Sequence, residues 1–344
     1  MNPIYQFPQS VQTQTTGNPP SRGHAAIQAE IIDSERKCVI MIIATTKELK
    51  NQEYRVGLTP DNAAEYILHG HRVLVEKGAG AGAGFSDEEY IRAGAQLLSD
   101  PREIFAQADM IVKVKEPEPS EYALFREGQI LYTYLHLAAN PELTRALMER
   151  GVRAVAYETM TEPGGGLPCL RPMSQIAGRL SIQEGAKYLE KAFGGRGILL
   201  SGVPGVEKGN VVIIGGGTAG TYAAKAAAGI GANVTVLDID TNRLACLEDI
   251  LGSSVTTLYS SEANIRKALS QADLVIGSVL IPGAKTPKLV RREHLPLMKK
   301  GAVIVDIAID QSGCCESSHV TTHDDPVFTE QGVVHYCVGI LPTQ

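Results

Sequence analysis

The chain has 344 residues, a length that usually corresponds to about two domains. Its 32 Lys and Arg residues against 38 Asp and Glu residues leave a net charge of −6, which excludes nucleic-acid binding driven by overall positive charge. The longest apolar stretches, such as Val39 to Ala44, are far shorter than a membrane span, so we expect no membrane association.

The six cysteines and eight histidines show no spacing typical of a zinc site or a redox pair, and we assign no metal. Scattered thiols in a chain of this length indicate a reducing compartment, so we expect a cytoplasmic protein. Residues 1–40 are rich in Pro, Gln, Thr and Ser and lack periodicity, which predicts a disordered extension. They carry no apolar core of a secretory signal, and their acidic residues disfavour a transit peptide.

From Val39 onward, apolar runs alternate with segments of helical pattern. Five strands are predicted in the first half, at residues 39–44, 72–76, 111–115, 130–136 and 153–157. Three helices are predicted between or beside them, at residues 60–69, 87–94 and 141–150. This alternation is typical of an α/β domain with mostly parallel strands. The turn-rich segment 162–168 predicts the end of this first domain, which we place at residues 41–168 and expect to bind the substrate.

A second alternating run follows. A long helix is predicted over 174–193, with Ser174 as its N-cap. Further helices are predicted at 218–229 and 241–250, and strands at 211–214, 233–238, 272–277, 302–308 and 333–338. The fold class is therefore α/β, with two Rossmann-like domains of mostly parallel strands and a cleft between them. The second domain spans residues 169–344.

A glycine motif in the second domain predicts a dinucleotide site. Gly215, Gly217 and Gly220 form a GxGxxG pattern directly after a predicted strand and at the start of a predicted helix. Asp238 ends the next strand, where a carboxylate accepts hydrogen bonds from a ribose. This acid would repel a 2′-phosphate, which favours NAD over NADP, although Arg243 lies five residues further on.

Cations of the first domain are candidates for holding an anionic substrate. Arg55 lies in a predicted loop and is either a clamp for a small carboxylate or a solvated surface residue. Lys113 and Lys115 alternate in a predicted strand, so both point to one face. Lysines seldom line a buried face without a partner, and we expect at least one of them to reach a cleft.

Two further positions are suited to moving protons. His136 ends a predicted strand, at the edge of the sheet where α/β enzymes bind ligands, although a buried structural histidine would fit equally well. Asp306 and Asp310 lie in one apolar run, and one of them is expected to act as an acid or base while the other is structural.

Several longer motifs resemble one known family. These are KELKNQEYRVGLTP, KVKEP, YLHLAAN, RPMSQIAGRLS, SGVPGVE, IGGGTAG, GSVLIPGAKTPKLV and VDIAIDQSG, and they occur in order between about residues 41 and 341. The chain resembles the alanine dehydrogenases, with the alpha subunits of nicotinamide nucleotide transhydrogenases as more distant relatives. LHLAA and DIAIDQ distinguish the dehydrogenases from the transhydrogenases.

The resemblance implies reversible, NAD-dependent oxidative deamination of L-alanine to pyruvate and ammonium. It also implies a homohexamer. Arg55 and Lys115 would then hold the substrate, and His136 and Asp310 would be the acid–base pair. Beside the glycines, the NAD site would contain Ser174, Thr218, Ala219, Asp238, Arg243, Ser260, Val279, Leu280, Ile307, Ala308, Ile309 and Asp310.

The chain departs from the family pattern near residue 340. Family members continue beyond this point with a segment that returns to complete the substrate domain, whereas this sequence stops at Gln344. His319 and Ile340 also replace the usual family residues. We therefore expect reduced stability and activity. The alternatives are an inactive remnant that still binds NAD and a related amino-acid or imine oxidoreductase.

Overall fold

The structure is a computed structural model that describes residues 39–137, 140–279 and 286–339. The chain divides into two units, residues 1–40 and residues 41–344, and the second is described below. The extension predicted over 1–40 lies outside the described residues except for its last two positions. Among the described residues, no helix combines the length and apolarity needed to cross a bilayer.

The first sheet contains six strands, all parallel, in the order β3-β2-β1-β4-β5-β6. The strands are β1 (Ile42–Thr45), β2 (Arg72–Glu76), β3 (Gln96–Leu98), β4 (Met110–Val112), β5 (Ile130–Thr133) and β6 (Arg153–Ala156). Alternate residues of β1 and β2 are buried against different helices, as expected for a parallel sheet with helices on both faces.

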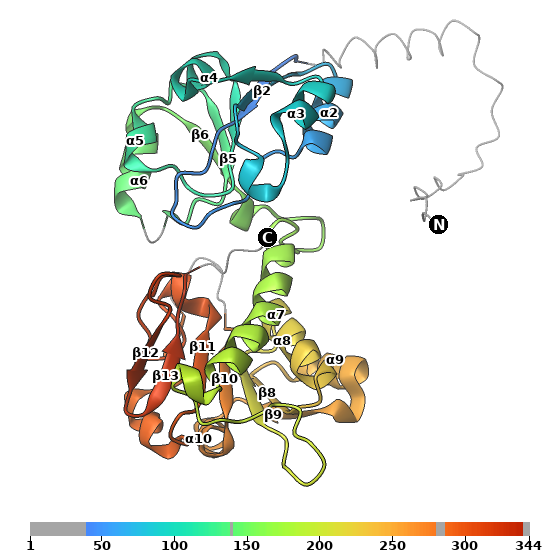
Figure 1. Cartoon of the computed structure of the whole chain (residues 1–344), viewed down its shortest axis with the longest axis vertical. Coiled ribbons are helices and arrows are strands. Elements are labelled where there is room, and N and C mark those ends of the chain that lie inside the picture. Colours follow the sequence, from blue (N-terminus) through green and yellow to red (C-terminus); the bar gives the residue numbers. More distant parts are fainter. Residues whose placement is uncertain (1–38, 138–139, 280–285, 340–344) are drawn as a thin grey trace, which may run out of the picture. The chain divides into compact units, whose positions relative to one another are not determined.

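The helices of this domain are α2 (Pro60–Leu68), α3 (Asp87–Arg92), α4 (Pro101–Gln107), α5 (Pro119–Tyr122) and α6 (Pro141–Glu149). Helices α2 and α3 pack on one face of the sheet, where Tyr90 is fully buried against Ile43 and Val73. Helices α4 and α6 cover the other face, with Phe105 and Leu143 in the core. Figure 1 shows this domain in blue and green.

The second sheet contains seven strands in the order β12-β13-β11-β10-β7-β8-β9, and only the β12–β13 pair is antiparallel. The strands are β7 (Asn210–Ile214), β8 (Asn233–Asp238), β9 (Val255–Tyr259), β10 (Leu274–Gly277), β11 (Val303–Asp306), β12 (Val327–Glu330) and β13 (Val333–Tyr336). The prediction of two α/β domains with mostly parallel sheets is confirmed.

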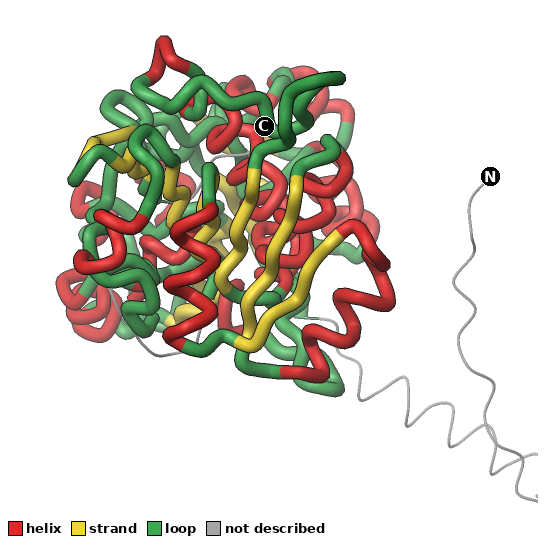
Figure 2. The backbone as a smooth tube through the Cα atoms, turned by 90° about the horizontal axis from the view of Figure 1, so that it is seen from below, coloured by secondary structure: helices red, strands yellow, loops and turns green. Residues whose placement is uncertain are grey.

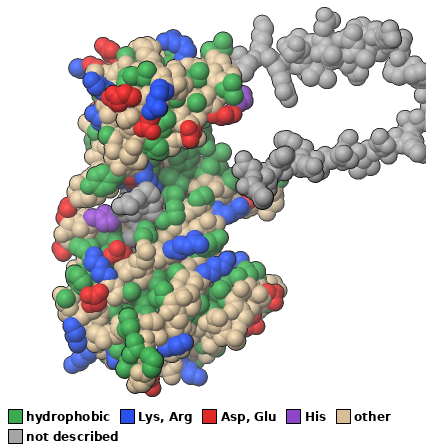
Figure 3. Space-filling model, turned by 45° about the vertical axis from the view of Figure 1, so that its right-hand side comes forward, with side chains coloured by type: hydrophobic (Ala, Val, Ile, Leu, Met, Phe, Trp, Pro, Cys, Tyr) green, Lys and Arg blue, Asp and Glu red, His purple; other side chains and the backbone are tan. Residues whose placement is uncertain are grey.

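Helices flank this sheet on both faces. They are α7 (Leu170–Tyr188), α8 (Thr218–Gly229), α9 (Thr241–Leu251) and α10 (Glu262–Gln271). Helices α7 and α8 pack with Val211 and Ile213 on one face, whereas α10 packs with Val212 and Ile214 on the other. Figure 2 shows strands with helices lying to both sides of them. In Figure 3, acidic and basic side chains are interspersed over much of the visible surface, in agreement with the small net charge.

The long helix α7 begins earlier than predicted. It starts at Leu170, so Ser174 lies inside the helix, and the N-cap position is Cys169, whose side chain makes no capping bond. Pro172 stands in the first turn, where a missing N–H and a fixed φ suit a helix start. The helix also ends earlier than predicted, at Tyr188, and a 3-10 turn at Lys191–Phe193 follows.

Several predicted strands extend beyond their observed ends, and three of them matter for the site. β4 ends at Val112, because the Glu48 carboxylate accepts the N–H groups of Val114 (2.7 Å) and Lys115 (3.3 Å). β5 ends at Thr133, so His136 lies in the loop that follows it. β11 ends at Asp306, and the 3-10 helix η7 (Ile307–Gln311) replaces the predicted continuation.

Candidate functional site

The glycine motif forms a tight turn between β7 and α8. Gly215 has φ +103°, a conformation that L side chains rarely adopt. A Cβ atom on Gly220 would lie 1.8 Å from the carbonyl oxygen of Gly215, so only glycine permits this approach. Ser278 donates hydrogen bonds from Oγ to the carbonyl oxygens of Gly215 (2.8 Å) and Ile214 (3.0 Å) and fixes the turn from β10. The turn therefore leads directly into the N-terminus of α8.

Asp238 connects the end of β8 to this turn. Its Oδ2 accepts the N–H of Gly216 (2.5 Å) and its Oδ1 accepts the N–H of Asp240 (2.9 Å). Arg243 contacts the same turn from α9, where Nε donates to the carbonyl oxygen of Gly216 and Nη2 donates to Oγ1 of Thr221 (2.7 Å). Arg243 thus supports the glycine turn itself.

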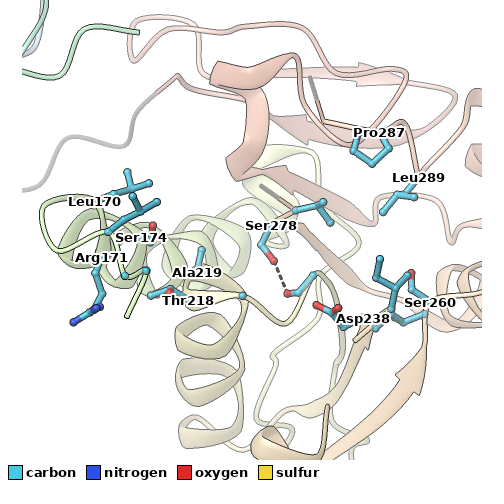
Figure 4. A pocket seen from close by; sticks show the side chains of 18 residues that line it. Leu170, Arg171, Ser174, Thr218, Ala219, Asp238, Ser260, Ser278, Pro287 and Leu289 are labelled. Atoms are coloured by element: carbon cyan, nitrogen blue, oxygen red, sulfur yellow. Dashed lines mark hydrogen bonds between the residues drawn. The ribbon is translucent and has the colours of Figure 1, made fainter. Parts of the chain in front are cut away.

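A cavity of about 590 Å³ opens over the glycine turn. Figure 4 shows Leu170, Arg171 and Ser174 of α7 at one end, beside Thr218 and Ala219. At the other end lie Asp238, Ser260, Pro287 and Leu289. The cavity therefore extends from the first turns of α7, past the start of α8, to the end of β8.

Most of the predicted cofactor residues line this cavity. They are Ser174, Gly215, Gly217, Thr218, Ala219, Asp238, Ser260 and Val279. Gly220 and Arg243 act behind the wall, on the turn itself, and Ile307, Ala308 and Ile309 are not lining residues. Leu280 and the side chain of Asp310 lie outside the described residues.

Sequence reasoning missed part of the cavity wall. The missed residues are Gly165, Gly166, Leu167, Leu170, Arg171, Leu237, Ile239, Ser278, Pro287 and Leu289. Gly165 and Gly166 fall in the segment that the sequence predicts as a domain boundary, and glycine also permits a ligand to approach the backbone closely. The other residues carry no local signal, because their place on the wall depends on tertiary packing.

The cavity fits a dinucleotide by its chemistry. The N-terminus of α8 presents backbone N–H groups and a positive dipole end to a pyrophosphate. Asp238 supplies a carboxylate for ribose hydroxyls, and Leu237, Ile239, Pro287 and Leu289 supply an apolar wall nearby. A Cβ atom on Gly217 would meet nothing within 4 Å, so the turn stays open at this point.

Arg55 is held by a neighbouring acid. Its Nε and Nη2 donate to the two carboxylate oxygens of Glu53, at 2.7 and 2.6 Å, and its Nη1 lies 3.3 Å from Sδ of Met173. Burial alone would raise the pKa of Glu53, but the hydrogen bonds and charge of Arg55 and the charge of Lys115 lower it. The charges of Arg55 and Lys115 therefore both act on the carboxylate of Glu53. Because Arg55 is paired with Glu53, it is not a solvated surface arginine.

The two candidate lysines have different environments. Lys113 is 1% exposed and its Nζ is paired with Glu121 (2.9 Å) and Glu48 (3.6 Å), which makes it a structural cation. Lys115 is 7% exposed. Its backbone is held from both sides, because Glu48 accepts its N–H and Thr133 Oγ1 donates to its carbonyl oxygen at 2.9 Å. Glu48 and Thr133 therefore fix the backbone of Lys115.

His136 is bound to two acids in different ways. Its ring nitrogen Nδ1 lies 3.2 Å from Oε2 of Glu116, and its backbone N–H donates to Oε1 of Glu158 at 2.8 Å. The residue has φ +48°, a left-handed backbone conformation that is uncommon for any residue other than glycine. The ring of Tyr134 is stacked with it, at 6.2 Å between centroids. The loop after β5 thus holds His136 tightly.

Of the two carboxylates in the 302–310 run, only the side chain of Asp306 lies among the described residues. Asp306 is 1% exposed and accepts the backbone N–H groups of Cys314 (3.2 Å) and Cys315 (3.0 Å). It is therefore structural, since it ties the end of β11 to the chain after η7. Asp310 belongs to η7, and the role predicted for its side chain stays a prediction.

Comparison with known proteins places both halves of the chain in one family. Residues 44–177 match the family described as "Alanine dehydrogenase/PNT, N-terminal domain", and residues 181–344 match "Alanine dehydrogenase/PNT, C-terminal domain". The chain is 55% identical over 303 residues to the alanine dehydrogenase of Methanococcus maripaludis, covering 88% of this chain and 81% of that protein. It is also 55% identical to the alanine dehydrogenase of Bacillus subtilis, covering 88% and 80%.

Solved structures agree with this assignment. A structure of L-alanine dehydrogenase superposes with a TM-score of 0.83 at 52% identity, covering 87% of this chain and 82% of that one. A transhydrogenase from Sinorhizobium meliloti superposes with a TM-score of 0.73 at 26% identity, covering 87% and 86%. The resemblance is therefore stronger to the dehydrogenase than to the transhydrogenase.

Proposed function

Since the chain belongs to the alanine dehydrogenase/PNT family, we propose that it catalyses reversible, NAD-dependent oxidative deamination of L-alanine to pyruvate and ammonium. The observation that carries this proposal is the 55% identity over 303 residues to proteins of that name. The dinucleotide-type cavity supports it, and so do the charges of Arg55 and Lys115 that act on Glu53 and the contact between His136 and Glu116.

The cofactor half of the site is supplied by the second domain. The amides at the start of α8 would hold the pyrophosphate, Asp238 would hold a ribose, and Ser174 and Arg171 would stand at the other end of the cavity. NAD, when bound, accepts or returns a hydride. The position of Asp238 favours NAD over NADP, because a carboxylate repels a 2′-phosphate.

The substrate half is proposed to lie in the first domain. Arg55 would bind the carboxylate of alanine or pyruvate with the part of its guanidinium that faces away from Glu53. Lys115 would bind the carbonyl oxygen of pyruvate, where its charge stabilises negative charge that develops on that oxygen. Glu48 and Thr133 hold the backbone of Lys115 and so fix the point from which its side chain extends.

Proton transfer is assigned to His136 and Asp310. His136 would exchange protons with the nitrogen and oxygen of the substrate as water adds and ammonium leaves, because imidazole titrates near neutral pH. Asp310, which belongs to η7, would be the second acid–base group. We also propose that the protein is a cytoplasmic homohexamer, as the family resemblance implies, and light scattering on the purified chain tests the assembly.

The test is NADH oxidation by the purified chain with pyruvate and ammonium. We expect turnover that needs both compounds and that falls at least 100-fold in His136→Ala, while the exposed His323→Ala serves as the matched control. Turnover with another 2-oxo acid but not with pyruvate would replace alanine as the substrate. A folded protein that binds NADH without any turnover would contradict the proposed reaction.

A further inference from the structure

Glu116 connects a lysine and a histidine that lie far apart in the sequence. Its Oε2 is 3.2 Å from Nδ1 of His136, and its Oε1 is paired with Nζ of Lys50. The Glu116 side chain is only 11% exposed, so water screens these contacts weakly. Lys50, Glu116 and His136 therefore form a chain of charge-assisted contacts that ends on the imidazole ring.

This arrangement determines which ring nitrogen carries a proton. Burial alone would raise the pKa of Glu116, but the hydrogen bonds and charges of His136 and Lys50 lower it to about 2. The carboxylate is thus ionised at any pH at which a histidine titrates, and an ionised carboxylate only accepts hydrogen bonds. Nδ1 must therefore carry its hydrogen toward Glu116, and Nε2 is the nitrogen that gains and loses a proton.

Among the described residues, Glu158 and Tyr134 also contact His136, at its backbone and at its ring face respectively. Glu158 accepts the N–H groups of Leu135 and His136 and so holds the turn, and Tyr134 is stacked with the ring. Of the two acids beside His136, Glu158 binds the backbone whereas Glu116 contacts the ring. Glu116 is accordingly the acid placed to orient the imidazole and to stabilise its protonated form.

We propose that Glu116 and Lys50 are positioning residues for His136, which together fix its tautomer and set the pH at which the ring exchanges a proton. The carboxylate of Glu116 favours the protonated ring, and Lys50 offsets part of this effect because it neutralises the same carboxylate. The inference rests on the proposed function, in which His136 is the acid–base group.

The test compares Glu116→Gln and Lys50→Met with a matched control, Lys47→Met. Lys47 lies in the same segment as Lys50 but pairs with Glu76, at 3.8 Å, so its removal changes the same charge without touching Glu116. The titration of the His136 ring is followed by NMR of 13C-labelled histidine, with the signal assigned through His136→Gln. The pH dependence of kcat/KM for pyruvate is measured on the same variants.

We expect the midpoint of the His136 titration to move down by about 1 pH unit in Glu116→Gln and to move up in Lys50→Met, with no change in Lys47→Met. The acid limb of the kcat/KM profile should follow. We also expect kcat to fall in Glu116→Gln, and Glu116→Asp should retain part of it. A midpoint unchanged in Glu116→Gln, or moved in the same direction by both variants, overturns the inference. If Glu116→Gln fails to fold, Lys50→Met decides the question alone, because Lys50 is 36% exposed.

The titration requires no turnover, which separates this inference from the proposed function. Opposite shifts in a protein without alanine dehydrogenase activity would support the positioning role and reject the reaction. Normal turnover with unshifted midpoints would support the proposed reaction and reject the positioning role of Glu116 and Lys50.

Discussion

A Cβ atom on Gly178 would lie 2.2 Å from the carbonyl oxygen of Ala219. Helices α7 and α8 therefore approach each other at the first turn of α8, where the glycine motif presents its backbone amides. Ser174 lies one helical turn before Gly178 and lines the cavity beside Thr218 and Ala219. The close approach that Gly178 permits thus places Ser174 at the wall of the cavity.

Replacing Gly178 should separate the two helices. In Gly178→Ala the new Cβ atom meets backbone atoms that cannot rotate away, and we expect a loss of about 1–3 kcal/mol in the free energy of unfolding. Affinity for NADH should fall as well, because Ser174 moves from the start of α8. Chemical denaturation and NADH fluorescence titration measure the two effects.

The matched control for this substitution is Gly229→Ala at the end of α8, where a Cβ atom meets nothing within 4 Å. We expect it to leave NADH affinity unchanged and stability unchanged or slightly higher, since alanine favours a helix. Equal effects of the two substitutions would contradict the importance of close helix contact.

Removing the carboxylate of Asp238 should change the choice between cofactors. In Asp238→Ala the ribose loses a charged acceptor and a 2′-phosphate no longer meets a negative charge, while Arg243 stays beside the turn. We expect kcat/KM to fall about 10- to 100-fold with NADH and to rise with NADPH. Asp249→Ala, on the exposed side of α9, is the control, and steady-state kinetics with both cofactors decide the outcome.

The low pKa of Glu116 predicts an acid-dependent loss of stability. Its pKa is about 2 in the folded protein against an ordinary value of 4.5, so the folded state binds this proton less tightly than the unfolded state. The stabilisation is present in full above pH 4.5 and is lost as the pH falls toward 2, in an amount of about 3 kcal/mol. Denaturant unfolding at several pH values should show a shallower acid slope in Glu116→Gln, whereas the exposed Glu149→Gln should match the parent chain.

Lys288 should stabilise the chain segment that follows β11. Its Nζ donates to the carbonyl oxygens of Ser312, Gly313 (3.0 Å) and Cys315 (3.1 Å), while Asp306 accepts two N–H groups of the same segment. Lys288→Met leaves these carbonyl oxygens without their charged donor, and we expect the free energy of unfolding to fall by about 1–3 kcal/mol. Thermal unfolding measures it against Lys300→Met, an exposed lysine near β11, and equal melting temperatures would reject the role of Lys288.

Local sequence determined the elements around the glycine motif. The predicted bounds of α8 and β8 are those of the structure, because a glycine turn, a helix start and an apolar strand are all specified by neighbouring residues. The sequence misplaces the start of α7, because a prediction from local signals fails where those signals mislead. Cys169 at the N-cap gives no capping signal, whereas Ser174 inside the helix gives a false one. The alternation of strands and helices was sufficient for the fold class.

Tertiary structure alone decided the roles of similar side chains. Lys113 and Lys115 look equivalent in the sequence, and only the carboxylates of Glu48 and Glu121, which come from other segments, make Lys113 a buried structural cation. The pairing of Glu116 with His136 was likewise invisible, because it joins residues 20 positions apart. Sequence periodicity determines which face of an element is apolar, whereas the partner of a charge depends on how separate elements pack.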